Sequence, residues 1–190
     1  MKKFIYFLIM LISVPSIASA NIYIDALGAY TMAGDLDNQI GGGGCVATDI
    51  HPNVNIFFKD VYSTIRINAN KPDEEQYTFN MAMIGFQHLL QIAESPVYWT
   101  NSVGIGSGKG SSEVSVNYVS TSSSDNGICF AYWTGILIEA TQYISPYIEV
   151  GYHKTLFYSD FEDTNVSGFQ FLVGVRFTLF GKNRSITTRY

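Results

Sequence analysis

The sequence predicts an all-β fold, an eight-stranded antiparallel up-and-down transmembrane β-barrel, and three observations lead to it. The 190 residues are 47% hydrophobic and 15% aromatic but only 14% charged, whereas roughly a quarter of a typical soluble domain is charged. After residue 20 no apolar run approaches the roughly 20 residues that a membrane-spanning helix needs. Apolar residues instead recur at every second position in eight segments, which is the pattern of strands in a closed barrel.

Composition also excludes several classes of function. The formal net charge of -5 provides no basic surface for phosphate contacts, so we expect no nucleic-acid partner. Two cysteines are too few for a disulfide-dense scaffold or for a four-ligand zinc site. We therefore expect neither a metal nor a cofactor.

The N-terminal residues 1–20 have the pattern of a cleaved signal peptide. Two lysines precede the apolar run Phe4–Val14, and Ala18-Ser19-Ala20 has the small-x-small form that signal peptidase reads. A membrane anchor is the alternative, but the run is short for a bilayer span and is followed by serine and proline. We expect an exported chain with a barrel at 21–180 and a polar, basic tail at 181–190.

The first three predicted strands span 22–30, 42–50 and 54–68. The third strand departs from simple alternation. Its apolar alternation runs on even positions before Lys59-Asp60 and on odd positions after this dipeptide. The simplest explanation from sequence is a β-bulge at this dipeptide.

The remaining predicted strands span 77–89, 97–106, 128–139, 147–157 and 169–179. Their apolar sides are expected to face lipid: Tyr77, Phe79, Met81, Met83 and Leu89; Trp99; Ile128, Phe130, Tyr132, Ile136 and Ile138; Tyr152; and Phe169, Phe171, Val173, Val175, Phe177 and Leu179. The opposite faces, which include His88, Cys129, Ala131, Gly135, Glu139 and Arg176, are expected to face the lumen.

The connections between these segments alternate in character. Tight turns are predicted at His51-Pro52-Asn53, Glu94-Ser95-Pro96 and Ile144-Ser145-Pro146, and longer polar loops at 31–41, 69–76, 107–127 and 159–167. Short turns on one rim and long loops on the other are typical of bacterial outer-membrane barrels, which expose the loops outside the cell. Glycines at 41–44 and 104–110 lack the spacing of a phosphate-binding loop and are interpreted as flexible rim segments or strand bends.

Three passages carry a resemblance to a known family: Ala47–Val54, Ile144–Tyr152 and Phe171–Phe180. On these, and over essentially the whole chain after residue 20, the sequence resembles the small eight-stranded outer-membrane proteins grouped around OmpX, OmpW, the OmpA transmembrane domain and the neisserial opacity proteins. The resemblance implies a place in the cell outer membrane, contact with its lipid and lipopolysaccharide, and recognition of the last strand by the barrel-assembly machinery. Because a tail follows that strand here, the terminal aromatic is either Phe180 or Tyr190.

The alternative for such a pattern is a soluble eight-stranded barrel such as a lipocalin, which turns its apolar face inward around a ligand. Neither Trp99 nor Trp133 lies in the N-terminal Gly-x-Trp setting of lipocalins. The regular alternation of short and long connections, and charges that fall at one height on the non-apolar face, also favour the membrane barrel.

Strand parity places four charged residues in the lumen. Asp25, Glu139, Glu149 and Arg176 are all expected to point inward, near the periplasmic ends of consecutive strands. An arginine among carboxylates in a narrow lumen forms charge-assisted hydrogen bonds. We expect this network to plug the barrel, with a gate or narrow ion path as the alternative.

The two cysteines, Cys45 and Cys129, are expected to point inward near the outer rim. They belong to strands on opposite sides of an eight-membered ring, and a disulfide needs Cα atoms within about 7 Å. Two buried thiols are therefore favoured, with a disulfide as the alternative if the strand ends bend inward.

Enzymatic activity is not expected. Some barrels that edit lipid A carry a His-x-Ser pair, but the nearest analogue, His153-Lys154-Thr155, lacks the serine.

The leading hypothesis is a non-enzymatic outer-membrane protein, a surface antigen, adhesin-like or envelope-stabilising protein, whose loops bind an extracellular ligand. Acidic residues in three of the four loops are expected to be solvated, or else to bridge to lipopolysaccharide through divalent cations. The alternative function is a narrow pore or passive transporter of small or apolar molecules.

Overall fold

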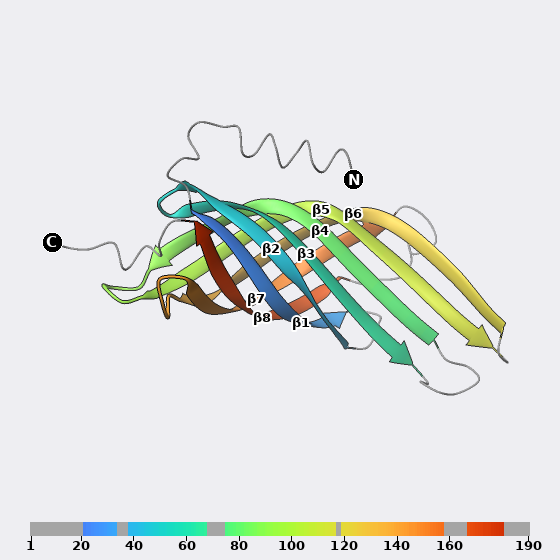
Figure 1. The fold of residues 1–190 in the computed structure, drawn as a ribbon. Helices are drawn as coiled ribbons and strands as arrows, with labels where there is room; N and C mark the ends of the chain where they lie inside the picture. The colour runs from blue at the N-terminus through green and yellow to red at the C-terminus, as the bar shows by residue number, and fades with distance from the viewer. Residues whose placement is uncertain (1–20, 34–37, 68–74, 117–118, 158–166, 181–190) are drawn as a thin grey trace.

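The computed structural model describes residues 21–33, 38–67, 75–116, 119–157 and 167–180. They form one closed antiparallel barrel of eight strands, in which every strand pairs with its neighbours in chain order and β8 closes on β1 (Figure 1). The predicted fold class is confirmed. The predicted signal peptide at 1–20 and the tail at 181–190 lie outside the described residues.

The strand bounds are close to those predicted except in the middle of the chain. The strands are β1 Ile22–Ala33, β2 Gln39–His51, β3 Val54–Ile67, β4 Glu75–Gln91, β5 Val97–Val116, β6 Val119–Ile138, β7 Ile144–Phe157 and β8 Gly168–Phe180. Within the described residues, no helix has both the length and the apolar character needed to cross a membrane.

The largest difference from the prediction is the hairpin of β5 and β6. Each of these strands has 20 residues, whereas the others have 12 to 17. Cross-strand pairs continue from Val97 with Ile138 to Val116 with Val119, so most of the predicted loop 107–127 is strand. The two strands consequently reach further than the rest of the barrel (Figure 1). In this segment Ser111, Ser112 and Ser115 pair across the strands with Ser124, Ser123 and Ser120, and such polar pairs give no hydrophobic alternation from which a strand could be predicted.

Outward-facing positions are apolar over most of the barrel wall. Trp99, Tyr132, Tyr152 and Phe169 are all exposed, as predicted. The alternation in β8 also holds, since Phe171, Val173, Phe177 and Leu179 are exposed while Leu172 and Arg176 are buried. This apolar exterior argues against a lipocalin-like orientation, in which the apolar face would be inside.

The predicted orientation of β4 was wrong. Phe79, Met81, Met83 and Leu89 are buried inside the barrel, and Tyr77 packs against the same interior cluster. His88, expected inside, is exposed on the outer face together with Ile84 and Phe86. Both faces of β4 carry large apolar residues, so alternation alone did not distinguish them.

The predicted β-bulge at Lys59-Asp60 was also wrong. Register is continuous through this dipeptide on both sides of β3, and the chain simply alternates. Lys59 and Val61 are buried, while Phe58 and Tyr62 are exposed. Lys59 therefore points into the lumen and Asp60 points outward.

The short turns fall at one end of the barrel, where β1 begins and β8 ends. Two of them lie at the predicted prolines, and one has Ala93 with a φ of 53°. The third turn does not lie where it was predicted. Ile144, Ser145 and Pro146 begin β7, and the turn is formed by residues 139–143. Glycines 41–44 and 104–110 lie within β2 and β5 and not in rim segments.

Candidate functional site

The barrel lumen holds the main concentration of buried charge. Asp25 on β1 and Arg176 on β8 are direct cross-strand partners, and both side chains are buried. Arg176 donates from Nε to Asp25 Oδ1 and from Nη2 to Asp25 Oδ2, each at 2.8 Å. Its guanidinium also lies 5.2 Å from the ring centroid of Tyr23. This two-point geometry is the strongest form of an arginine–carboxylate contact.

A second ion pair crosses the lumen. Lys59 on β3 donates from Nζ to Glu149 Oε2 on β7 at 2.8 Å, and both side chains are almost fully buried. The same ammonium lies 4.2 Å from the centroid of the Trp133 ring and 5.5 Å from that of Phe57. Two aromatic faces and one carboxylate thus surround the lysine charge.

Gln87 on β4 joins the two ion pairs. Its Oε1 accepts from Arg176 Nη1 at 2.9 Å, and its Nε2 donates to Glu149 Oε1 at 3.1 Å. Ser102 and Thr100 on β5 also donate to Glu149 Oε1, at 3.3 and 3.4 Å. Side chains from β1, β3, β4, β5, β7 and β8 therefore form one hydrogen-bonded layer across the barrel.

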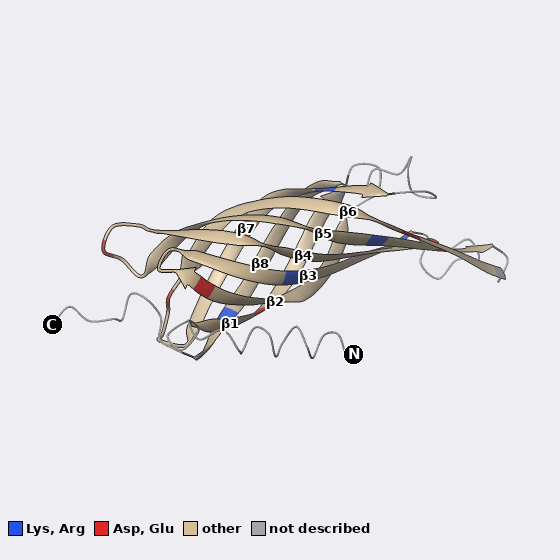
Figure 2. Ribbon diagram, turned by 90° about the horizontal axis from the view of Figure 1, so that it is seen from above, with Lys and Arg blue, Asp and Glu red and all other residues tan. Residues whose placement is uncertain are grey.

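The structure places the four predicted lumen residues as follows. Asp25, Glu149 and Arg176 belong to this layer. Glu139 is buried but directly follows β6, and it accepts a hydrogen bond from Tyr98 at 3.4 Å. Figure 2 shows how few charged residues the described strands carry along the barrel wall.

Sequence reasoning missed Lys59, which pairs with Glu149, and Gln87, which links Arg176 to Glu149. Lys59 was assigned to a bulge, and Gln87 lies on the strand whose faces were inverted. Phe57, Lys59 and Val61 occupy every second position of β3 and are all buried. Had this alternation been followed through the dipeptide, it would have placed Lys59 in the lumen.

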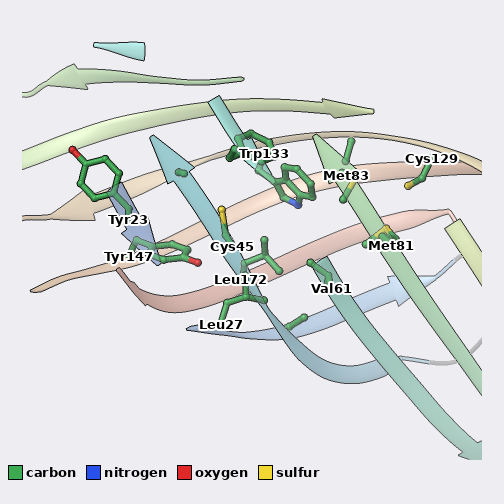
Figure 3. Packing of buried hydrophobic residues seen from close by; sticks show 14 of the residues in the cluster. Tyr23, Leu27, Cys45, Val61, Met81, Met83, Cys129, Trp133, Tyr147 and Leu172 are labelled. Carbon is green, nitrogen blue, oxygen red and sulfur yellow. The ribbon is translucent and has the colours of Figure 1, made fainter. Parts of the chain in front are cut away.

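The lumen is filled on the loop side of this layer as well. Trp133 donates from Nε1 to Gln170 Oε1 at 3.0 Å, and Gln170 donates to Thr31 Oγ1 at 3.2 Å. Apolar side chains fill much of the remaining interior (Figure 3): Leu27, Val61, Met81, Met83 and Leu172. An eight-stranded barrel is just wide enough for its side chains to fill it.

The cysteines are both buried, and neither is in a disulfide. Cys45 is the cross-strand partner of Asp25 and Lys59, so it lies level with the charged layer and not near the outer rim as expected. Cys129 pairs with Gly106 and Thr155, farther along the barrel (Figure 3).

His153, the residue closest to a catalytic pattern, is a packed interior side chain. It is fully buried, and its ring stacks on Phe79 with centroids 5.6 Å apart. Within the described part of the chain, no group of His, Cys, Asp and Glu is arranged to hold a metal ion.

Comparisons with known proteins give structural matches alone: no family model and no curated protein matches the sequence. The attachment invasion locus protein Ail of Yersinia pestis, solved in complex with the heparin analogue sucrose octasulfate, is 15% identical with a TM-score of 0.58, over 84% of this chain and 97% of Ail. Pseudomonas aeruginosa outer membrane protein OprG is 10% identical with a TM-score of 0.56, over 86% and 97%. Neisserial surface protein A is 14% identical with a TM-score of 0.52, over 83% and 96%.

At these identities the likeness is one of fold. The barrel is closed, its eight strands pair in chain order, and its exterior is apolar, all of which agree with a shared fold. The chain therefore has the fold of the small eight-stranded outer-membrane β-barrels.

Proposed function

We propose that this protein is a non-enzymatic barrel of the bacterial outer membrane that binds an extracellular ligand through its surface-exposed end, in an adhesin-like role. The observation that carries the proposal is the contrast between the two parts of the molecule. A hydrogen-bonded layer that includes two linked ion pairs crosses the lumen, whereas β5 and β6 extend beyond the other strands.

The distal ribbon, formed by residues 110–116 of β5 and 119–125 of β6, is the part that we assign to binding. Its residues include Ser111, Ser112, Ser115, Ser120, Thr121, Ser122, Ser123 and Ser124. The hydroxyls of Ser115 and Ser120 lie 2.8 Å apart across the strands. Hydroxyl groups both donate and accept hydrogen bonds, so a paired ribbon presents them to a ligand in a fixed register.

The name of one structural neighbour agrees with an adhesin-like class of function. Ail is named for attachment and invasion and was solved with a heparin analogue. The distal ribbon here carries Glu113 and Asp125 and no lysine or arginine among its described residues. A polar protein surface therefore suits it better than a sulfated polyanion.

Adherence of whole cells tests the proposal. Bacteria displaying the protein are compared with a variant in which residues 112–123 are replaced by Asn-Gly, which leaves the Ser111–Ser124 pair to flank a two-residue turn. We expect binding to a surface coated with extracellular proteins to rise above that of cells without the protein, and to be lost with the shortened hairpin. Equal adherence of cells with and without the full-length protein would remove the adhesin-like role, provided that heat-modifiable gel mobility shows a folded barrel.

A further inference from the structure

The apolar outer wall of β4, β5 and β6 ends, on the side away from the short turns, at a row of polar side chains. Lys109 of β5 is exposed, and its direct partners across the strands are Asn80 of β4 and Asn126 of β6. Ser107, the next outward residue of β5 toward the short turns, is exposed as well. In an outer-membrane barrel the end of the apolar band marks the level of the lipid head groups. A cation between two amides therefore lies at the level of the outer-leaflet head groups.

Asp60 of β3 adds a hydrogen-bond acceptor to this row. Asn80 donates from Nδ2 to Asp60 Oδ1 at 3.1 Å, which ties the carboxylate to the partner of Lys109. A carboxylate accepts about four hydrogen bonds, so Asp60 can accept more from a ligand. Among the described residues, the Lys109 ammonium makes no hydrogen bond or ion pair. The row thus presents a cation, amides, a hydroxyl and an acceptor on one outward surface.

An apolar hollow with a volume of about 300 Å³ lies next to the row, on the side of the short turns. Its lining includes Ile84 and Phe86 of β4 and Val103 and Ile105 of β5. Ile105 and Ser107 are successive outward residues of β5. The hollow and the polar row are therefore parts of one continuous surface, apolar at the level of the acyl chains and polar above them.

A ligand that fits both parts has an anionic head with hydrogen-bond donors and an acyl chain. Phosphate is the lipid anion that lysine and amide groups bind. A carboxylate such as Asp60 repels phosphate but accepts hydrogen bonds from the hydroxyl and amide groups of a sugar. We propose that this face is a specific site for lipopolysaccharide, which places a phosphate of its glucosamine head group on Lys109, sugar donors toward Asp60 and an acyl chain in the hollow.

Lys154 of β7 provides a matched control on the same barrel. It is exposed and faces outward, but its partner on β6 is Phe130, and the next outward residues of β7 are Tyr152 and Leu156. The side chains next to this lysine are therefore apolar or aromatic. A general attraction of lysine to anionic lipid would involve both lysines equally, whereas a specific site depends on Lys109.

Native mass spectrometry of the folded barrel in detergent micelles, titrated with bis-phosphorylated lipid A, tests the site. We expect one tightly bound lipid A per barrel. Its affinity should fall about fivefold with Lys109→Gln, as expected for one lysine at an anionic head group, and should be retained with Lys109→Arg. Lys154→Gln should leave the affinity unchanged. Ile105→Trp, which fills the hollow, should weaken binding roughly threefold through lost acyl-chain contact.

Titrations with phosphatidylglycerol and phosphatidylethanolamine distinguish the glycolipid from other sources of phosphate. Both should bind about fivefold more weakly than lipid A or not at all, because neither has the sugar donors for Asp60. Equal affinity for either of these lipids, equal losses with Lys109→Gln and Lys154→Gln, or undiminished binding by Lys109→Gln or Ile105→Trp would overturn the assignment. Heat-modifiable gel mobility of each variant establishes that the barrel is folded before the titration.

Discussion

Arg176 belongs to both the Asp25 ion pair and the wider lumen layer. It donates to Asp25 at two points and to Gln87 at a third, and it lies beside the ring of Tyr23. A buried charge is tolerated because each partner removes part of the cost of leaving water. Removing one partner therefore leaves a greater penalty than the pair itself contributed in stability.

The first prediction follows from this asymmetry. Arg176→Leu leaves the buried Asp25 carboxylate without its cation, and the expected loss is about 3–5 kcal/mol of unfolding free energy. The temperature at which the folded band disappears on a semi-native gel should fall. The double variant Arg176→Leu with Asp25→Leu should recover part of that loss, because no lone charge remains. If Arg176→Leu resists heat as well as the wild type, the ion pair contributes nothing to stability.

The inward and outward faces of a strand were predictable from the sequence where they differ in polarity, and not where both are apolar. In β8 every outward residue is apolar and the inward side carries Gln170, Arg176 and Thr178, so alternation identified both faces. In β4 the lumen side is apolar too, because Met81 and Met83 fill the interior. Where apolar side chains fill the interior, alternate residues of a strand no longer differ in polarity. For this reason Gln87 was not assigned to the lumen layer.

Close packing between strands gives the second prediction. A Cβ on Gly151 of β7 would lie 2.1 Å from the Tyr132 carbonyl oxygen and 2.5 Å from Trp133 Cδ1. Gly151→Ala should therefore cost about 1–3 kcal/mol through overpacking. The control is Gly28→Ala on β1, where the nearest atom is the Val173 carbonyl oxygen at 3.9 Å, and a change within about 0.5 kcal/mol is expected. Urea unfolding followed by tryptophan fluorescence measures both, and equal stability of the two variants would contradict the packing argument.

At the scale of the whole molecule, the barrel combines a filled interior with an extended outer hairpin. The interior contains two ion pairs, the Gln170–Trp133 contact and an apolar cluster. The topology was predictable, since the strand number follows from alternation and turn spacing. The length of β5 and β6 was not predictable, because polar strands stabilised by backbone pairing carry no hydrophobic signal.

The third prediction concerns passage through the lumen. Because the charged layer is hydrogen-bonded across the barrel, the purified protein in a planar bilayer should show no steady conductance steps under conditions in which a 16-stranded porin conducts. Liposomes containing it should not swell in small sugars. Reproducible open-channel steps in the wild type would contradict the plugged lumen and favour passive transport.

The contact between Asp25 and Arg176 lies at the seam where the first and last strands meet. A slip of one residue at this seam would turn one of the two charged side chains toward lipid. A slip of two residues would set Arg176 against Tyr23 or Leu27, leaving both charges buried and separated. The ion pair therefore discriminates among the ways in which the ends of the chain can join, and it favours the one closure that neutralises both charges.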